Sequence, residues 1–83
     1  MNKLLITLEI PSMGESFDLF APGFLEIGML IPLLTEAVAE LSGHRFTPSG
    51  QELLCSEKGK TLFCPDRTLG EYGVKNGDRL MLF

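Results

Sequence analysis

The fold is decided by the last stretch of the chain, Asp66-Arg67-Thr68-Leu69-Gly70-Glu71-Tyr72-Gly73-Val74-Lys75-Asn76-Gly77-Asp78-Arg79-Leu80-Met81-Leu82-Phe83. It begins with a short turn that carries Leu69 and Tyr72, and an Asn-Gly-Asp turn follows at residues 76–78. The apolar run over residues 79–83 is then predicted to be a strand. A terminal strand needs partner strands, and the upstream sequence supplies candidates for them.

Two upstream segments show the period of two that is typical of half-buried strands. Residues 3–10 alternate between apolar and more polar positions, and residues 16–20 alternate again. The segment Pro11-Ser12-Met13-Gly14-Glu15 between them has the composition of a turn. These residues are therefore predicted to form a hairpin, which Ala21-Pro22-Gly23 is predicted to end.

The segment from Ile27 to Leu41 has helical periodicity, and Ser42-Gly43 is typical of a helix end. Pro32 conflicts with this pattern because it lacks the amide that should donate one turn back. Either the regular helix starts near Met29, which would place Pro32 in the first turn, or the helix kinks at Pro32. The late start is the favoured interpretation. The apolar face of this helix consists of Ile27, Leu30, Ile31, Leu34, Ala37, Val38 and Leu41.

Two more strands are predicted after the helix, at residues 51–56 and, as a short piece, at residues 61–63. The resulting order is strand, strand, helix, strand, short strand, strand. This order predicts an α+β fold of the β-grasp type, with a mixed four- to five-stranded sheet wrapped on one helix. No internal repeat or linker divides the chain, so residues 1–83 are expected to be a single domain.

The same order, with Thr68-Leu69-Gly70-Glu71-Tyr72 before the final turn, is similar to ubiquitin over nearly the whole chain. The runs Phe17-Asp18-Leu19, Leu25-Glu26-Ile27 and Gly73-Val74-Lys75-Asn76-Gly77-Asp78-Arg79-Leu80, together with Pro22, resemble the YukD/EsaB-type proteins more closely. Those proteins are encoded with type VII (ESX-like) secretion systems of Gram-positive bacteria. The resemblance implies a cytosolic accessory protein without conjugating activity, whose partners are components of the secretion machine. Similar domains also form the cytosolic part of a membrane component, so an isolated domain of a larger protein is the alternative.

Composition excludes several other classes of partner. The net charge is −4, from 7 basic and 11 acidic residues, and the basic residues are scattered singly. Nucleic-acid binding needs a basic stripe, so no nucleic acid is expected. The longest mostly apolar run, residues 27–35, is shorter than the roughly 18 residues that span a bilayer. Neither membrane insertion nor a secretion signal is predicted, which makes the cytoplasm the expected compartment.

The residue types needed for catalysis or metal binding are sparse, so no enzyme activity, cofactor or metal is predicted. Cys55 and Cys64 are the only cysteines and His44 is the only histidine. Two thiols do not provide the four ligands of a structural zinc site or of an iron–sulfur cluster. The two cysteines are expected to be reduced thiols, with a redox or metal role for them as a remaining alternative. Glu36 and Glu40 are expected to form a solvated helix face.

The candidate functional residues are exposed apolar side chains on two surfaces. On the helix these are Met29 and Leu33, unless the segment 21–26 folds over them. On the sheet, the ubiquitin resemblance implies a patch from the third and last strands, namely Leu53 or Leu54 with Met81 and Phe83. A one-residue slip exchanges the faces of a strand, so the choice between Leu53 and Leu54 stays open, and Leu54 enters the candidate set. Partner docking or homodimerisation would cover Phe83.

The predicted function is therefore a non-catalytic protein-interaction module. A modifier or a sulfur carrier is the less favoured alternative, because such proteins need a terminal Gly-Gly for adenylation. The sequence ends on Phe83 without that motif, so we expect no conjugation.

Overall fold

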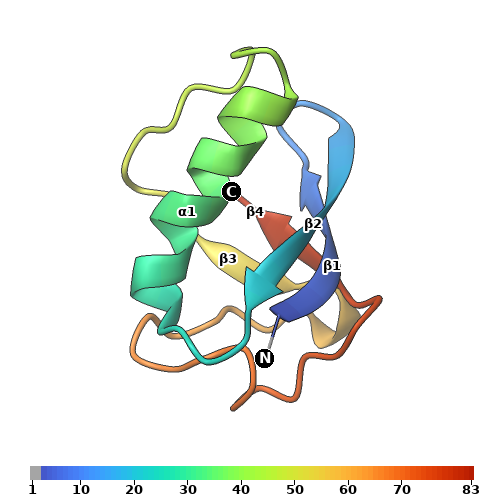
Figure 1. Cartoon of the computed structure of the whole chain (residues 1–83), viewed down its shortest axis with the longest axis vertical. Helices are drawn as coiled ribbons and strands as arrows, with labels where there is room; N and C mark the ends of the chain where they lie inside the picture. The colour runs from blue at the N-terminus through green and yellow to red at the C-terminus, as the bar shows by residue number, and fades with distance from the viewer. Residues whose placement is uncertain (1–2) are drawn as a thin grey trace.

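The computed structural model describes residues 3–83, and it contains four strands and one α-helix (Figure 1). The elements are β1 (Lys3–Ile10), β2 (Glu15–Pro22), α1 (Ile27–Leu41), β3 (Leu54–Ser56), a 3₁₀ turn (Lys58–Lys60) and β4 (Arg79–Leu82). The sheet order is β2-β1-β4-β3. β1 pairs with β2 and β4 pairs with β3 in antiparallel fashion, whereas β1 and β4 are parallel. The predicted β-grasp fold with a mixed sheet is thus confirmed.

The hairpin closes over a short turn at residues 11–14, where the N–H groups of Met13 and Gly14 both donate to the carbonyl of Ile10 at 2.9 and 3.0 Å. Gly14 has a φ of 67°, a conformation that glycine adopts without steric cost. β2 is longer than predicted and includes Ala21 and Pro22. Ala21 is buried in the core, and proline is tolerated at the end of a strand that lies at the sheet edge.

Helix α1 has the predicted bounds, but the favoured late start is wrong because regular helix begins at Ile27. Glu26 at the N-cap makes no side-chain hydrogen bond to the first turn. Instead, the N–H groups of Ile27 and Gly28 donate to the backbone carbonyls of Arg67 and Pro65, at 2.7 and 3.0 Å. The first turn, whose N–H groups have no partner within a helix, is therefore fixed by a distant segment.

Pro32 consequently lies inside α1, in its second turn. Its missing amide leaves the carbonyl of Gly28 without the usual donor from within the helix. One turn later, the Thr35 hydroxyl donates to the carbonyl of Pro32 at 2.9 Å, which helps to bury that polar side chain. The helix continues through the proline because packing fixes both of its halves: Ile27, Leu30, Leu34 and Val38 are all buried.

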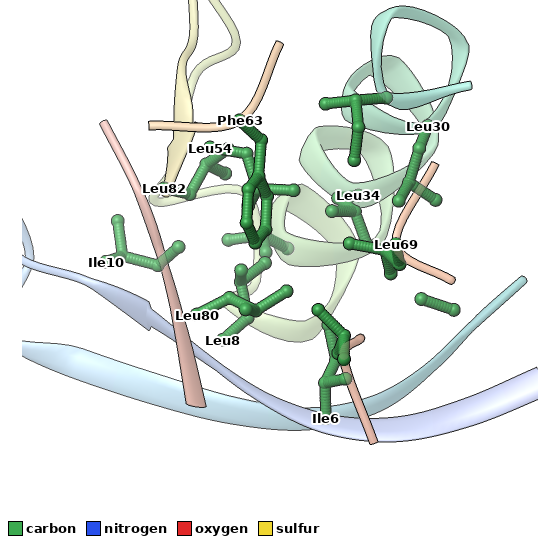
Figure 2. Packing of buried hydrophobic residues seen from close by; sticks show 14 residues of the cluster. Ile6, Leu8, Ile10, Leu30, Leu34, Leu54, Phe63, Leu69, Leu80 and Leu82 are labelled. Atoms are coloured by element: carbon green, nitrogen blue, oxygen red, sulfur yellow. The ribbon is translucent and has the colours of Figure 1, made fainter. Parts of the chain in front are cut away.

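The core lies between α1 and the inner face of the sheet, as Figure 2 shows for the side chains that meet there. Ile6, Leu8 and Ile10 of β1 alternate inward, as the period of two predicted. Residues 63–74 contribute three more apolar side chains to the same layer. The buried hydrophobic cluster comprises Ile6, Leu8, Ile10, Ala21, Ile27, Leu30, Leu34, Val38, Leu54, Phe63, Leu69, Val74, Leu80 and Leu82.

The final turn joins the last strand to the first. Gly77 N–H donates to the carbonyl of Leu5 at 2.7 Å, and the Asn76 side-chain oxygen accepts from Leu5 N–H at 2.8 Å. Just upstream, Thr68 and Glu71 exchange side-chain-to-backbone bonds of 3.0 and 3.1 Å, the reciprocal pattern of a capping box. The Asn-Gly-Asp turn predicted from the sequence therefore positions β4, because its residues Asn76 and Gly77 are hydrogen-bonded to Leu5 of β1.

The third strand differs from its prediction. Regular pairing starts at Leu54, not at residue 51, and the predicted short strand at residues 61–63 contains only an isolated bridge, Cys55 with Leu62. Leu54 is opposite Leu82 and only 1% exposed, so its assignment to the outer surface is wrong. Leu53 is the outward residue, at 52% exposure. The two adjacent leucines gave no periodic signal that distinguishes the faces.

This register predicts that substitutions of two neighbouring leucines change the stability by very different amounts. Leu54→Ala leaves a cavity in the core and should lower the free energy of unfolding by about 2–5 kcal/mol. Leu53→Ala changes an exposed side chain and should alter it by less than about 0.5 kcal/mol. Urea denaturation of both variants measures the difference, and equal losses would contradict the register.

Candidate interaction surface

The outer face of β4, which points away from α1, carries the first part of the candidate surface. Leu80 and Leu82 are buried, so alternation turns Met81 and Phe83 outward, as predicted. Phe83 is 57% exposed, whereas Met81 is half-buried between its neighbours on the adjoining strands. An aromatic ring this exposed adds a large apolar area to the outer face of the sheet.

Leu53 lies directly opposite Phe83. The two residues exchange both backbone hydrogen bonds, Leu53 N–H to Phe83 carbonyl and Phe83 N–H to Leu53 carbonyl, each at 2.8 Å. Directly paired residues in an antiparallel ladder have side chains on the same face of the sheet. Leu53 therefore replaces Leu54 as the partner of Phe83 in the candidate surface.

The next row of side chains continues this surface across the sheet. Cys55 pairs with Met81 on one side and bridges to Leu62 on the other, so all three share the outer face. Leu62 is exposed, and Cys55 is buried beneath its neighbours. We call this set, Leu53, Cys55, Leu62, Met81 and Phe83, the sheet patch.

A charged rim lies along β1 and β4 beside the sheet patch. Glu9 is opposite Met81 in the parallel pairing, and its carboxylate accepts from the guanidinium of Arg79, with Nε at 2.9 Å. Glu57 lies 3.8 Å from the same guanidinium. The hydrogen bond that Arg79 donates to Glu9 raises the pKa of Arg79 above its ordinary value, with the negative charge of Glu9 adding to the effect. The apolar patch thus ends at a fixed cluster of charges, as in a protein interface with a polar rim.

The helix candidates form a separate surface. Met29 and Leu33 are 62% and 50% exposed, so the segment 21–26 does not cover them. Because α1 packs against the inner face of the sheet (Figure 1) and these side chains belong to its exposed face, they lie on the opposite side of the molecule from the sheet patch. The structure therefore does not bring the two candidate sets together.

Sequence reasoning missed two exposed phenylalanines. Phe20 is opposite Leu5 on the outer face of the hairpin, and Phe24 borders a shallow hollow with Leu4 and Val74. The pairing of Phe20 with Leu5 follows from the alternation of both strands once the loop length is known. Phe24 gave no such signal, because it lies in the irregular connection between β2 and α1.

Reactive groups are few on this surface. Cys55 and Cys64 are free thiols, the first buried and the second exposed. Among residues 3–83, no group of three or more His, Cys, Asp or Glu side chains is arranged to hold a metal ion.

These elements, with one helix on a mixed sheet and parallel first and last strands, define a ubiquitin-like β-grasp protein. The chain belongs to the YukD family, described as protein YukD of the WXG100 protein secretion system (Wss), whose family model matches residues 5–82. No curated protein sequence matches the chain significantly.

Solved structures of similar fold include domains of secretion proteins. The EccD5 ubiquitin-like domain from Mycobacterium xenopi matches with a TM-score of 0.81 and 20% identity, over 100% of this chain and 94% of that chain. The ubiquitin-like domain of the Mycobacterium tuberculosis type VII secretion system protein EccD1 matches with a TM-score of 0.76 and 21% identity, over 99% and 98%. A chain of the MycP5-free ESX-5 inner membrane complex matches with a TM-score of 0.72 and 17% identity, over 100% of this chain and 21% of that chain.

Within the part of the chain that the structure describes, no helix combines the length and apolar character required to cross a bilayer.

The different burial of the two thiols predicts their reactivity. Cys64 should react rapidly with a thiol reagent in the folded protein, whereas Cys55 should react slowly because its sulfur is covered within the sheet patch. Kinetics with Ellman's reagent measure both rates, and Cys64→Ser isolates the slow one. Equal rates in the folded protein would contradict the burial of Cys55.

Proposed function

We propose that this protein is a non-catalytic ubiquitin-like binding module of a type VII secretion system, and that it docks on a protein of the secretion machine through the sheet patch. The observation that carries this proposal is the pair Leu53 and Phe83, two adjacent apolar side chains that are both more than half exposed. Exposed apolar clusters rimmed by charge are typical of protein-binding surfaces.

The sheet patch suits this role better than the helix surface does. Leu53 and Phe83 are held opposite each other by two backbone hydrogen bonds, so the backbone at both positions is already ordered before a partner covers them. An aromatic side chain next to leucine and methionine resembles the anchors that dominate binding energy in interfaces. Met29 and Leu33 stand on a helix face that becomes acidic at Glu36 and Glu40.

We place the module in the cytosol, either as an accessory protein or as a domain of a larger membrane component. The second form is supported by the match to a long chain of an inner membrane complex, of which the aligned part is about a fifth. Both forms use the same docking surface, and neither requires a cofactor.

The binding test uses a variant in which both anchors become charged, Leu53→Asp with Phe83→Asp. Because two buried apolar contacts are lost, its affinity for the secretion component should fall by about 30-fold or more. Co-purification from cells that express the secretion machine identifies the component, and titration calorimetry measures the affinity.

The matched control is Met29→Asp with Leu33→Asp, which places the same two charges on the helix surface. This control should bind as the unmodified protein does, and circular dichroism should show that both variants are folded. If the helix variant loses binding and the sheet variant keeps it, the docking surface has been assigned to the wrong side.

The non-covalent mode has its own test. Protein isolated from its native cells under denaturing conditions should give one intact mass, without covalent adducts to other proteins. Intact-mass spectrometry measures this. Any adduct that survives denaturation and thiol reduction would contradict the non-covalent docking role and indicate that the protein is a covalent modifier.

A further inference from the structure

The two edges of the sheet differ in whether their backbone groups are hydrogen-bonded to another segment of the chain. At the β3 edge, residues 61–63 supply extra hydrogen bonds: Ser56 N–H donates to Thr61 carbonyl at 2.8 Å, and Phe63 N–H donates to Leu54 carbonyl at 2.9 Å. The other edge is β2, and among residues 3–83 only β1 pairs with it. One edge is thus covered and the other is open.

The pattern of backbone bonds shows which groups of the hairpin face that open edge. In β1, the carbonyl of Leu5 accepts from Gly77, and Thr7 N–H donates to Asp78 carbonyl at 3.0 Å. Both groups point toward β4. Because successive residues of a strand direct their backbone groups to opposite edges, Leu4, Ile6 and Leu8 point toward β2.

The partners of those three β1 residues are Ala21, Leu19 and Phe17. The backbone groups of the intervening residues of β2 therefore point toward the free edge of the sheet. The N–H and C=O groups of Ser16, Asp18 and Phe20 consequently have no strand partner among residues 3–83. The register runs without a bulge from Glu15 to Pro22, and no lysine stands on the strand. Apart from the charge of Asp18, the usual devices that protect a sheet edge from pairing are absent along its middle.

Apolar side chains border this edge on its inner side. Phe17 and Leu19 face the helix layer but remain half-buried, because no further strand covers them. Gly28, Ile31, Pro32 and Thr35 line a groove with residues from the β3 side. Leu33 is half exposed and stands on the opposite side of α1 from that groove. An added strand at the β2 edge would meet the exposed parts of Phe17 and Leu19.

The charged side chains that β2 and α1 themselves carry are all acidic. β2 and α1 carry Glu15, Asp18, Glu36 and Glu40 and no lysine or arginine. Arg45 neutralises only Glu15, through paired hydrogen bonds of 2.6 and 3.0 Å. Within residues 3–83, the other three carboxylates take part in no ion pair. A segment that carries basic side chains is therefore complementary to this surface.

The same charges disfavour a second copy that pairs with β2 in the register centred on Asp18. In the symmetric antiparallel arrangement that pairs Ser16 with Phe20, the two Asp18 carboxylates would lie directly opposite each other, which is destabilising. The acidic helix faces would approach as well.

We propose that the open edge of β2 binds an extended segment of a partner protein in which apolar residues alternate with lysine or arginine, and that this segment adds a fifth strand to the sheet. Its backbone pairs with Ser16, Asp18 and Phe20, its apolar side chains contact Phe17 and Leu19, and its basic side chains lie beside Asp18. This site is distinct from the sheet patch, and it does not depend on the role proposed above.

The test uses a synthetic seven-residue probe, acetyl-Lys-Val-Lys-Val-Lys-Val-Lys-amide, and a matched probe with glutamate at each lysine. Amide exchange of the whole protein, measured per residue by NMR, should slow at Ser16, Asp18 and Phe20 when the lysine probe is added. Phe17 and Leu19, already bonded to β1, should change little. The glutamate probe should give no protection.

Removal and reversal of the charge at Asp18 provide a second experiment. Asp18→Asn should weaken binding of the lysine probe by about two- to fivefold, as expected for one exposed ion pair. Asp18→Lys should shift the preference toward the glutamate probe. The proposal is overturned if no probe protects the three edge amides, if protection appears elsewhere, or if those amides become protected with rising protein concentration alone, which would indicate self-pairing.

Discussion

The parallel pairing of β1 with β4 is the constraint on which the other elements depend. The N–H group of Thr7 donates to the carbonyl of Asp78 across this pair. In the preceding turn, Asn76 accepts from the N–H group of Leu5 and Gly77 donates to the carbonyl of Leu5. With Leu8 placed opposite Leu80, the inward face of β4 is determined, and β4 in turn determines the faces of β3. The position of every outward side chain of the sheet patch follows from that pairing.

The helix is fixed by a second long-range contact. Its first N–H groups are satisfied by the carbonyls of Pro65 and Arg67, so the segment before the last strand holds the start of α1. Gly28 is suited to this contact, because a Cβ there would lie 3.3 Å from the Pro65 side chain. The irregular segment of residues 63–74 also contributes Phe63, whose ring stacks on Tyr72 at 4.4 Å and closes the core.

The sequence predicted what depends on periodicity and missed what depends on contacts between distant segments. The alternation of β1 and the helical period of residues 27–41 gave both elements with their observed bounds. The start of regular helix at Ile27, which places Pro32 inside the helix, was missed. The distant carbonyls that accept from the first N–H groups override the preference of proline for the first turn. The choice between Leu53 and Leu54 was not decidable, since both are leucine and the register is set by pairing with β4. For the candidate surface, alternation placed the two outward residues of β4 correctly, whereas Leu62 was not predicted because it joins the outer face only through its bridge to Cys55.

The neighbouring positions of the first and last strands have a consequence for biosynthesis. During synthesis, the hairpin of β1 and β2 leaves the ribosome well before Arg79–Leu82, the strand that lies between β1 and β3 in the sheet. Until then the inward side chains of β1, Ile6, Leu8 and Ile10, lack their apolar neighbours Leu80 and Leu82 on the adjacent strand. Contacts of such large sequence separation form late and slow the search for the native state. A ribosome-associated chaperone would therefore encounter the hairpin with its apolar face incompletely covered for as long as β4 is not yet available.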